Sequence, residues 1–290
     1  MSVSVVARKD FEDALRSRML WSLTGLLAVL IAVGYVAVWN WGHDTTAEAM
    51  VGFLSLPLQV LVPISALIVG YMAVVGERRS GSIKLLLGLP PTRGDIVFGK
   101  LVGRSGVVAV AVLTGFAVAA LLSLALFGAL PLAALGGLLV ATLLLGLAFV
   151  GIAVGVSAAS ASRGRAMAAT VGTYIVFIGF WKLLTAGVYY FANDGAPSLP
   201  IEGPYLLLER LNPMQAFAVV ATELTGRDVF PVLFQYGVGI PTVPSSELST
   251  AVPGDLPFYL EPWSAVAVLV AWFVAPMTVG YLRFRAADLG

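Results

Sequence analysis

Long apolar runs separated by short polar stretches are the main pattern along this chain. Six runs are long enough for a membrane helix, which needs about 20 predominantly apolar residues to cross the hydrocarbon core. The predicted spans are residues 19–39, 51–75, 101–127, 131–160, 166–188 and 263–282. The pattern therefore predicts an all-α polytopic membrane protein, with six transmembrane helices in a single transmembrane domain of residues 1–290.

The amino-acid composition supports this class of membrane protein and excludes several kinds of chemical site. Hydrophobic residues make up 59% of the 290 residues and charged residues 11%, against about 25% charged residues in a typical soluble domain. The chain has no cysteine and one histidine, so imidazole and thiolate cannot assemble a zinc or copper site. No H-E-x-x-H or G-x-S-x-G motif occurs, and no paired carboxylates lie within a predicted span. We therefore expect no catalytic, metal or cofactor site in the chain itself.

Lys and Arg concentrate on one side of this predicted topology. With six spans, the N-terminal segment, the second and fourth connections and the C-terminal tail all face the same side. These segments hold Arg8, Lys9, Arg16, Arg18, Arg78, Arg79, Lys84, Arg93, Lys100, Arg104, Arg163, Arg165, Arg283 and Arg285. Short cytoplasmic loops of membrane proteins are enriched in Lys and Arg. The sequence therefore predicts a multi-pass protein of the cell (plasma) membrane with both termini in the cytoplasm.

The connection of residues 189–262 is then an extracytoplasmic segment. It is rich in proline, which favours turns and loops. It also carries more acidic than basic residues. Within it, the apolar run of residues 204–224 predicts one or two helices that lie on or dip into the outer leaflet, because Asn212-Pro213 and charged residues interrupt it. The acidic excess indicates either a solvated surface, which we favour, or a vestibule that attracts cations.

Lys182 lies well inside the fifth predicted span. An ionisable residue in the membrane is a functional candidate. Near the end of a helix, however, lysine extends its ammonium into the headgroups at little cost. Because Lys182 falls towards the outer face, we favour this second interpretation, and its role stays open.

Residues 1–18 predict an amphipathic helix that lies along the membrane. Apolar residues recur at helical spacing, at Val6 or Ala7, at Phe11 and at Ala14 or Leu15, with charged residues on the other faces. A basic amphipathic helix of this kind settles at the anionic inner leaflet. The residues assigned to this membrane-interface helix are Arg8, Lys9, Phe11, Arg16 and Arg18.

The connection of residues 76–100 is predicted to hold a short apolar helix between two interruptions. This helix follows a charged exit from the second span and Gly81, and covers about residues 82–89. Pro90-Pro91 ends it, because proline has no N–H for the helical ladder and restricts the residue before it. A short helix fixed in this way between two membrane spans can transmit rigid-body motion.

The stretch GDIVFGKL, residues 94–101, looks like an incomplete phosphate-binding loop. It has a glycine, four residues and Gly-Lys, but Leu101 stands where a Ser or Thr would hold magnesium. Thr92 followed by Asp95 predicts a capping box, which places this stretch inside a helix, and no strand is predicted before it. We therefore interpret it as the first turns of the third membrane helix, with Lys100 as an anchor on the cytoplasmic side.

Small residues at helical spacing suggest close helix packing at two places. Gly99-x-x-x-Gly103 and Gly151-x-x-x-Gly155 both permit a neighbouring helix to approach closely. Such spacing is common in membrane helices, so we expect packing within the chain, with a homodimer contact as the alternative.

These features together resemble the ABC-2 type permease family, whose connection after the second span forms a coupling helix that docks in a groove of a separate ATPase. The resemblance also extends to the amphipathic leader, the six-span layout and Leu-Asn-Pro at residues 211–213. The matching positions in the connection are Glu77, Arg78, Gly81, Leu86, Pro90, Arg93, Gly99 and Lys100. Ile83 departs from the Thr-Leu often found there.

The resemblance implies the permease subunit of an ATP-driven ABC transporter, an exporter without an ATPase site of its own. It implies an ABC ATPase subunit that binds ATP and Mg, a second permease copy or a homologue, and a lipid bilayer as partners, and no nucleic acid. The residues expected to couple to the ATPase are Glu77, Arg78, Arg79, Gly81, Ser82, Lys84, Leu86, Pro90 and Arg93.

Two alternatives remain at the level of sequence. A secondary transporter or channel would show ionisable residues near the membrane midplane or a repeat between the halves. A membrane scaffold would use the basic connection to bind lipid or a partner. The substrate, the direction of transport and the choice between homodimer and heterodimer stay open.

Overall fold

The computed structural model describes residues 2–41, 45–80, 92–195, 197, 200, 202–234, 248 and 252–287, with the backbone alone at residues 19, 41 and 78–80. Within these ranges the regular elements are helical. They are α1 (Val3–Leu15), α2 (Arg18–Trp41), α3 (Ala47–Gly70), α4 (Val75–Ser80), α6 (Arg93–Phe127), α7 (Leu132–Ala159), α8 (Arg163–Ile175), the π-helix η1 (Val176–Phe180), α9 (Trp181–Asn193), α10 (Gly203–Arg210), α11 (Pro213–Thr225), the 3-10 helix η3 (Phe258–Leu260) and α13 (Pro262–Ala286).

The six predicted spans are confirmed. Six helical stretches among the described residues are long and apolar enough to cross a membrane, namely Leu20–Asn40, Ala47–Glu77, Arg93–Phe127, Leu132–Ala159, Arg163–Asn193 and Pro262–Ala286. The third begins earlier than its apolar run because the Thr92 cap starts the helix ahead of the bilayer-length segment. The fifth consists of α8, η1 and α9 in succession.

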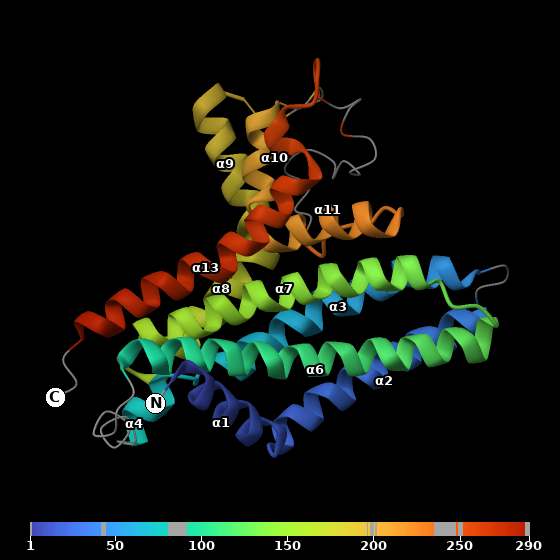
Figure 1. Cartoon of the computed structure of the whole chain (residues 1–290). Helices are drawn as coiled ribbons and strands as arrows, with labels where there is room; N and C mark the ends of the chain where they lie inside the picture. The colour runs from blue at the N-terminus through green and yellow to red at the C-terminus, as the bar shows by residue number, and fades with distance from the viewer. Residues whose placement is uncertain are drawn as a thin grey trace.

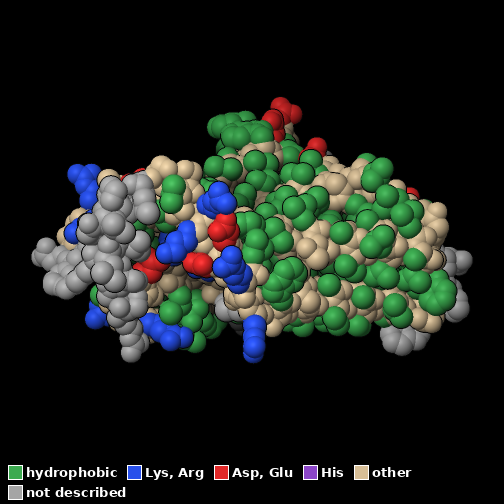
Figure 2. All heavy atoms as spheres, turned by 60° about the horizontal axis from the view of Figure 1, so that its bottom comes forward, with side chains coloured by type: hydrophobic (Ala, Val, Ile, Leu, Met, Phe, Trp, Pro, Cys, Tyr) green, Lys and Arg blue, Asp and Glu red, His purple; other side chains and the backbone are tan. Residues whose placement is uncertain are grey.

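Both chain termini lie at the same end of the helix bundle, where α6 begins and α13 ends (Figure 1). We call this the terminal end and the opposite one, where α6 passes into α7, the distal end. Helices α2, α3, α6 and α7 run side by side between the two ends, whereas α9 and α10 extend away from them (Figure 1). On one face of the molecule, Lys and Arg side chains gather at the terminal end, and hydrophobic side chains cover most of the rest (Figure 2).

Helix α7 forms the centre of the bundle and packs against α3, α6, α11 and α13. Its Gly151 lies against the backbone of Phe273 and its Gly155 against the backbone of Pro276 and Gly280, so a Cβ at either glycine would collide with α13. The predicted packing role of this glycine pair is confirmed. Close approach of backbones through small residues is a usual way to associate membrane helices, because lipid supplies no hydrophobic drive between them.

The turn between α10 and α11 reaches the fifth span at η1. The Asn212 amide donates to the Phe177 carbonyl at 2.8 Å, and its Oδ1 accepts the Met214 N–H at 2.8 Å to cap α11. The indole of Trp272 donates to the Leu211 carbonyl at 2.8 Å. One or two helices were expected in this run, and the structure has two, with the turn between them at Asn212-Pro213. Their place in the outer leaflet stays a prediction.

Lys182 is buried against α10, which contradicts the interpretation that its ammonium extends into the headgroups. The residue is only 7% exposed, and its positive charge acts on the buried Glu209 carboxylate of α10. The neighbouring Arg210 guanidinium donates to the Glu261 carbonyl at 3.1 Å and to the Ser264 hydroxyl at 2.9 Å, at the start of α13. No local pattern indicated that α10 would cover this part of the fifth span.

Candidate functional site

Three glycines on α6 make room for α1. A Cβ on Gly99 would lie 2.6 Å from Val6, and a Cβ on Gly103 would lie 3.1 Å from the Ala7 carbonyl oxygen. The apolar face of α1, which the sequence placed against lipid, therefore contacts α6. The position of α1 at the inner leaflet stays a prediction, with Arg8, Lys9, Arg16 and Arg18 exposed and Phe11 packed against Gly106.

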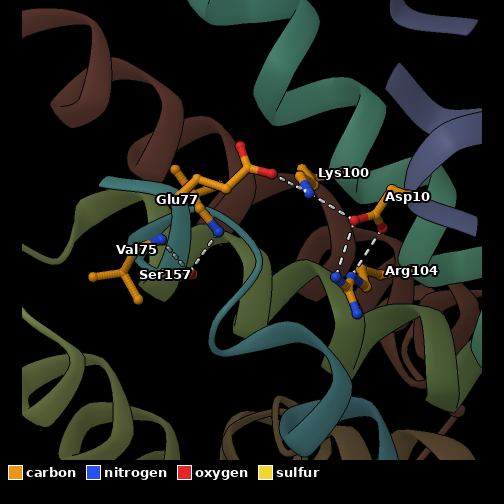
Figure 3. A network of polar contacts seen from close by, with 7 residues as sticks. Asp10, Val75, Glu77, Lys100, Arg104 and Ser157 are labelled. Atoms are coloured by element: carbon orange, nitrogen blue, oxygen red, sulfur yellow. Dashed lines mark hydrogen bonds and ion pairs between the residues drawn. The ribbon is translucent and has the colours of Figure 1, made fainter. Parts of the chain in front are cut away.

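Asp10 brings α1 into a buried charge network with α6 (Figure 3). One of its carboxylate oxygens accepts hydrogen bonds from Lys100 Nζ at 2.7 Å and from Arg104 Nη2 at 2.9 Å. Arg104 Nε lies 2.9 Å from the second oxygen, in an ion-pair contact without the alignment of a hydrogen bond. The Asp10 side chain is 2% exposed. A buried carboxylate is tolerated when cations and hydrogen bonds compensate for its lost hydration.

Glu77 extends the same network to α4. Its carboxylate forms an ion pair with Lys100 Nζ at 2.5 Å, so this one ammonium lies between two carboxylates from different helices (Figure 3). Two acids thus face two bases in a network that joins α1, α4 and α6. We call Asp10, Glu77, Lys100 and Arg104 the terminal junction.

Ser157, near the end of α7, fastens the start of α4. Its hydroxyl oxygen accepts the backbone N–H groups of Val74 at 3.0 Å and Val75 at 3.1 Å. These amides follow the end of α3 at Gly70, where the first N–H groups of a new helix need acceptors outside it. The turn from α3 into α4 is therefore held by α7, directly before Glu77.

Arg93 makes the corresponding connection at the other end of the 81–91 segment. Its Nη1 donates to the carbonyls of Phe284 at 2.9 Å, Arg285 at 2.7 Å and Ala287 at 2.7 Å. The last carbonyls of a helix have no partner within it, and a cation there also interacts favourably with the helix dipole. Arg93 thus ties the start of α6 to the end of α13.

The predicted coupling residues fall into two groups. Glu77 and Arg93 are described and hold the two ends of the segment. Gly81, Ser82, Lys84, Leu86 and Pro90 lie outside the described residues, as do the side chains of Arg78 and Arg79. The contacts of these seven with a partner stay predictions.

The interpretation of GDIVFGKL as the start of a membrane helix is confirmed. Thr92 accepts the Asp95 N–H at 3.1 Å, and Asp95 accepts the Thr92 N–H at 2.8 Å, which is a complete capping box at the beginning of α6. Residues 94–101 therefore lie in the first turns of a helix, and Lys100 lies between Asp10 and Glu77. This arrangement does not form a phosphate-binding loop.

Sequence reasoning did not identify Asp10 or Ser157. For Asp10 a signal exists, because a carboxylate between Ala7 and Ala14 lies on the apolar side of an amphipathic helix. Ser157 carries no comparable signal in a run of small residues. Among the described residues, no group of three or more His, Cys, Asp or Glu side chains could hold a metal ion.

A second feature is an open groove between α3 and α8, in the half of each membrane span nearer the terminal end. Its volume is about 360 Å³, and its walls include Ile64, Leu67 and Tyr71 from the α3 side and Thr170, Val171 and Tyr174 from α8. Within the described residues, the buried hydroxyls of Thr170 and Tyr174 have no hydrogen-bond partner. Buried polar groups are usually paired, so these two unpaired hydroxyls are unusual features of the groove wall.

The fold defines a polytopic helical membrane protein, and the comparison with protein families identifies its class. The model of the ABC-2 family transporter proteins matches residues 4–289, so the chain belongs to the ABC-2 type transporter permeases. It is 33% identical over 240 residues to the "Probable ABC transporter permease protein NosY" of Pseudomonas aeruginosa. The aligned region covers 78% of this chain and 82% of that protein. The protein of the same name from Stutzerimonas stutzeri is 31% identical over 229 residues, with 74% and 79% covered.

Proposed function

We propose that this ABC transporter membrane subunit is driven by a separate ATPase subunit, which binds ATP and Mg and pushes on the 76–100 connection. The observation that carries this proposal is that both ends of the 81–91 segment are tied to other helices. Glu77 joins α1 and α6 through Lys100, and Arg93 joins α13. A displacement of the segment would therefore reach α1, α6 and α13 together. The chain supplies no ATPase site in this proposal.

The proposed orientation places the terminal end in the cytoplasm and the protein in the cell membrane. Support comes from the enrichment of Lys and Arg in the N-terminal segment, the second and fourth connections and the tail, which is typical of cytoplasmic loops. The basic side chains that gather at the terminal end in Figure 2 agree with this orientation. An ATPase in the cytoplasm would then meet the 76–100 connection directly.

The proposed translocation path follows the groove between α3 and α8. This groove is lined by apolar side chains with the two buried hydroxyls, and it opens on the surface of the bundle. A second copy of the chain, or a homologue, would close its open side. Export is the proposed direction, because the sequence shows no segment typical of a site for a substrate-binding protein.

The test is capture of an ATPase by the tagged full-length chain from its own membranes in mild detergent. We expect an ATPase subunit with a complete phosphate-binding loop to co-purify, and ATP hydrolysis to accompany it. Reversal of charge in Glu77→Lys and Arg93→Glu should reduce capture or uncouple hydrolysis from transport. Glu12→Lys, on the exposed face of α1, is the matched control and should leave both unchanged. Failure of the wild-type chain to capture any ATPase would contradict the proposal.

A further inference from the structure

Residues 229–234 follow α11 as an extended segment that contacts two spans at once. Gln59 of α3 donates from Nε2 to the Phe230 carbonyl at 3.0 Å and accepts the Val232 N–H on Oε1 at 3.0 Å. The Phe234 N–H donates to the Ile178 carbonyl of η1 at 2.9 Å. The segment is thus hydrogen-bonded to both membrane spans that form the groove, to α3 and to η1 of the fifth span.

These contacts lie near the middle of the two spans. Gln59 stands halfway along Ala47–Gly70 and is fully buried. Ile178 lies halfway along the span Arg163–Asn193, where a π-turn interrupts the regular α-helical ladder. Irregular backbone at such a depth needs partners inside the protein, because hydrocarbon offers none. Gln59 supplies both an acceptor and a donor, as a neighbouring strand would.

The segment also lies directly beyond the groove. On α3 the groove begins at Ile64, about one helical turn past Gln59 towards the terminal end. On α8 it ends at Tyr174, about one turn before Ile178. The pinned backbone therefore bonds to the same two spans as the groove, on the distal side of the groove.

We propose that residues 229–234 close the distal end of the α3–α8 groove, and that Gln59 is the residue that positions them there. This inference rests on the proposed function, since it assigns the groove as the path and adds its distal closure. A neutral amide suits this role, because its two hydrogen bonds hold the segment without placing a charge near the middle of the spans. Release of the segment would connect the groove with the distal side.

The test uses the absence of cysteine in the chain. Val171→Cys introduces one thiol on the groove wall of the full-length protein in sealed vesicles. A membrane-impermeant maleimide is then added from the distal side. We expect slow labelling with Gln59 present, and in Gln59→Leu an increase of roughly tenfold, which corresponds to a change of about 1.4 kcal/mol in the opening equilibrium.

Two further variants keep the outcome interpretable. Gln215→Leu removes a half-buried glutamine of α11 that has no hydrogen bond to residues 229–234 in the described part of the chain, and should leave labelling slow. Phe234→Pro removes the N–H that reaches Ile178 while leaving Gln59 intact, and should accelerate labelling if Gln59→Leu fails to fold. Labelling that rises in neither Gln59→Leu nor Phe234→Pro, relative to Gln215→Leu, would overturn the proposal. This assay needs no ATPase. The labelling result can therefore contradict the closure of the groove while ATPase capture succeeds, and ATPase capture can fail while the labelling result supports the closure.

Discussion

The terminal junction and the Gln59 contacts join distant parts of the chain by different means. At the terminal end, Asp10 and Glu77 meet Lys100 and Arg104 in a network of charges between regular helices. Near the middle of the spans, Gln59 binds backbone groups of an irregular segment through neutral hydrogen bonds. Ion pairs that are buried and well paired are costly to break singly, whereas a pair of neutral hydrogen bonds has a modest net value.

This difference suggests a division of roles. The junction is suited to keep α1, α4 and α6 together while a force acts on the neighbouring connection. The Gln59 contacts are suited to form and break during a transport cycle. If so, substitutions in the junction should lower the stability of the protein more than substitutions at the Gln59 contacts.

Asp10→Ala should have the largest effect on stability. The substitution leaves Arg104 without the carboxylate that it contacts and removes one of the two carboxylate partners of Lys100. Loss of one partner from a buried ion pair costs about 3–5 kcal/mol of stability. Thermal unfolding of the purified protein in detergent, followed by the remaining monodisperse fraction, measures this loss. Asp13→Ala, on the exposed side of the same helix, is the control. Equal stability of the two variants would show that the junction does not hold α1.

Gly103→Ala should have the next largest effect, by preventing the approach that the junction requires. The new Cβ would lie 2.7 Å from Asp10 Oδ2 and 3.1 Å from the Ala7 carbonyl oxygen, and overpacking of this kind typically costs about 1–3 kcal/mol. The same unfolding assay applies, with protease sensitivity of α1 as a second measurement. Gly172→Ala is the control, because nothing lies within 4 Å of its Cβ position. An unchanged Gly103→Ala protein would contradict the close packing of α1.

Much of the fold follows from local patterns, whereas the contacts of the two regions do not. Apolar runs predict the six spans, and Thr92 with Asp95 predicts where α6 begins, since both signals lie within a few neighbouring residues. Asp10 and Lys100 are 90 positions apart, and Gln59 and Phe230 are 171 apart. No local pattern specifies such pairs. A polar residue on an apolar face indicates only that a partner exists.

Gln59→Leu should destabilise the protein by less than Asp10→Ala, by about 1–2 kcal/mol for the two hydrogen bonds lost and the backbone groups left unpaired. Thermal unfolding of both variants in one detergent gives the comparison directly. Gln215→Leu is again the reference, for loss of a half-buried glutamine amide. A Gln59→Leu protein as unstable as Asp10→Ala would mean that the segment is a fixed part of the core and unsuited to release.

Arg8→Ala should have the smallest effect and marks the lower limit of the comparison. Arg8 and Glu12 form an ion pair at 2.7 Å one turn apart on α1, but their side chains are 82% and 47% exposed. Water screens exposed pairs of this kind, and many contribute nothing measurable. We therefore expect an unfolding temperature equal to that of the wild type, at low and at high salt. A clear loss of stability would instead mean that Arg8 contacts a surface beyond the described residues, such as anionic lipid retained by the protein. Binding of the protein to vesicles with and without anionic lipid would then distinguish that contact from the ion pair with Glu12.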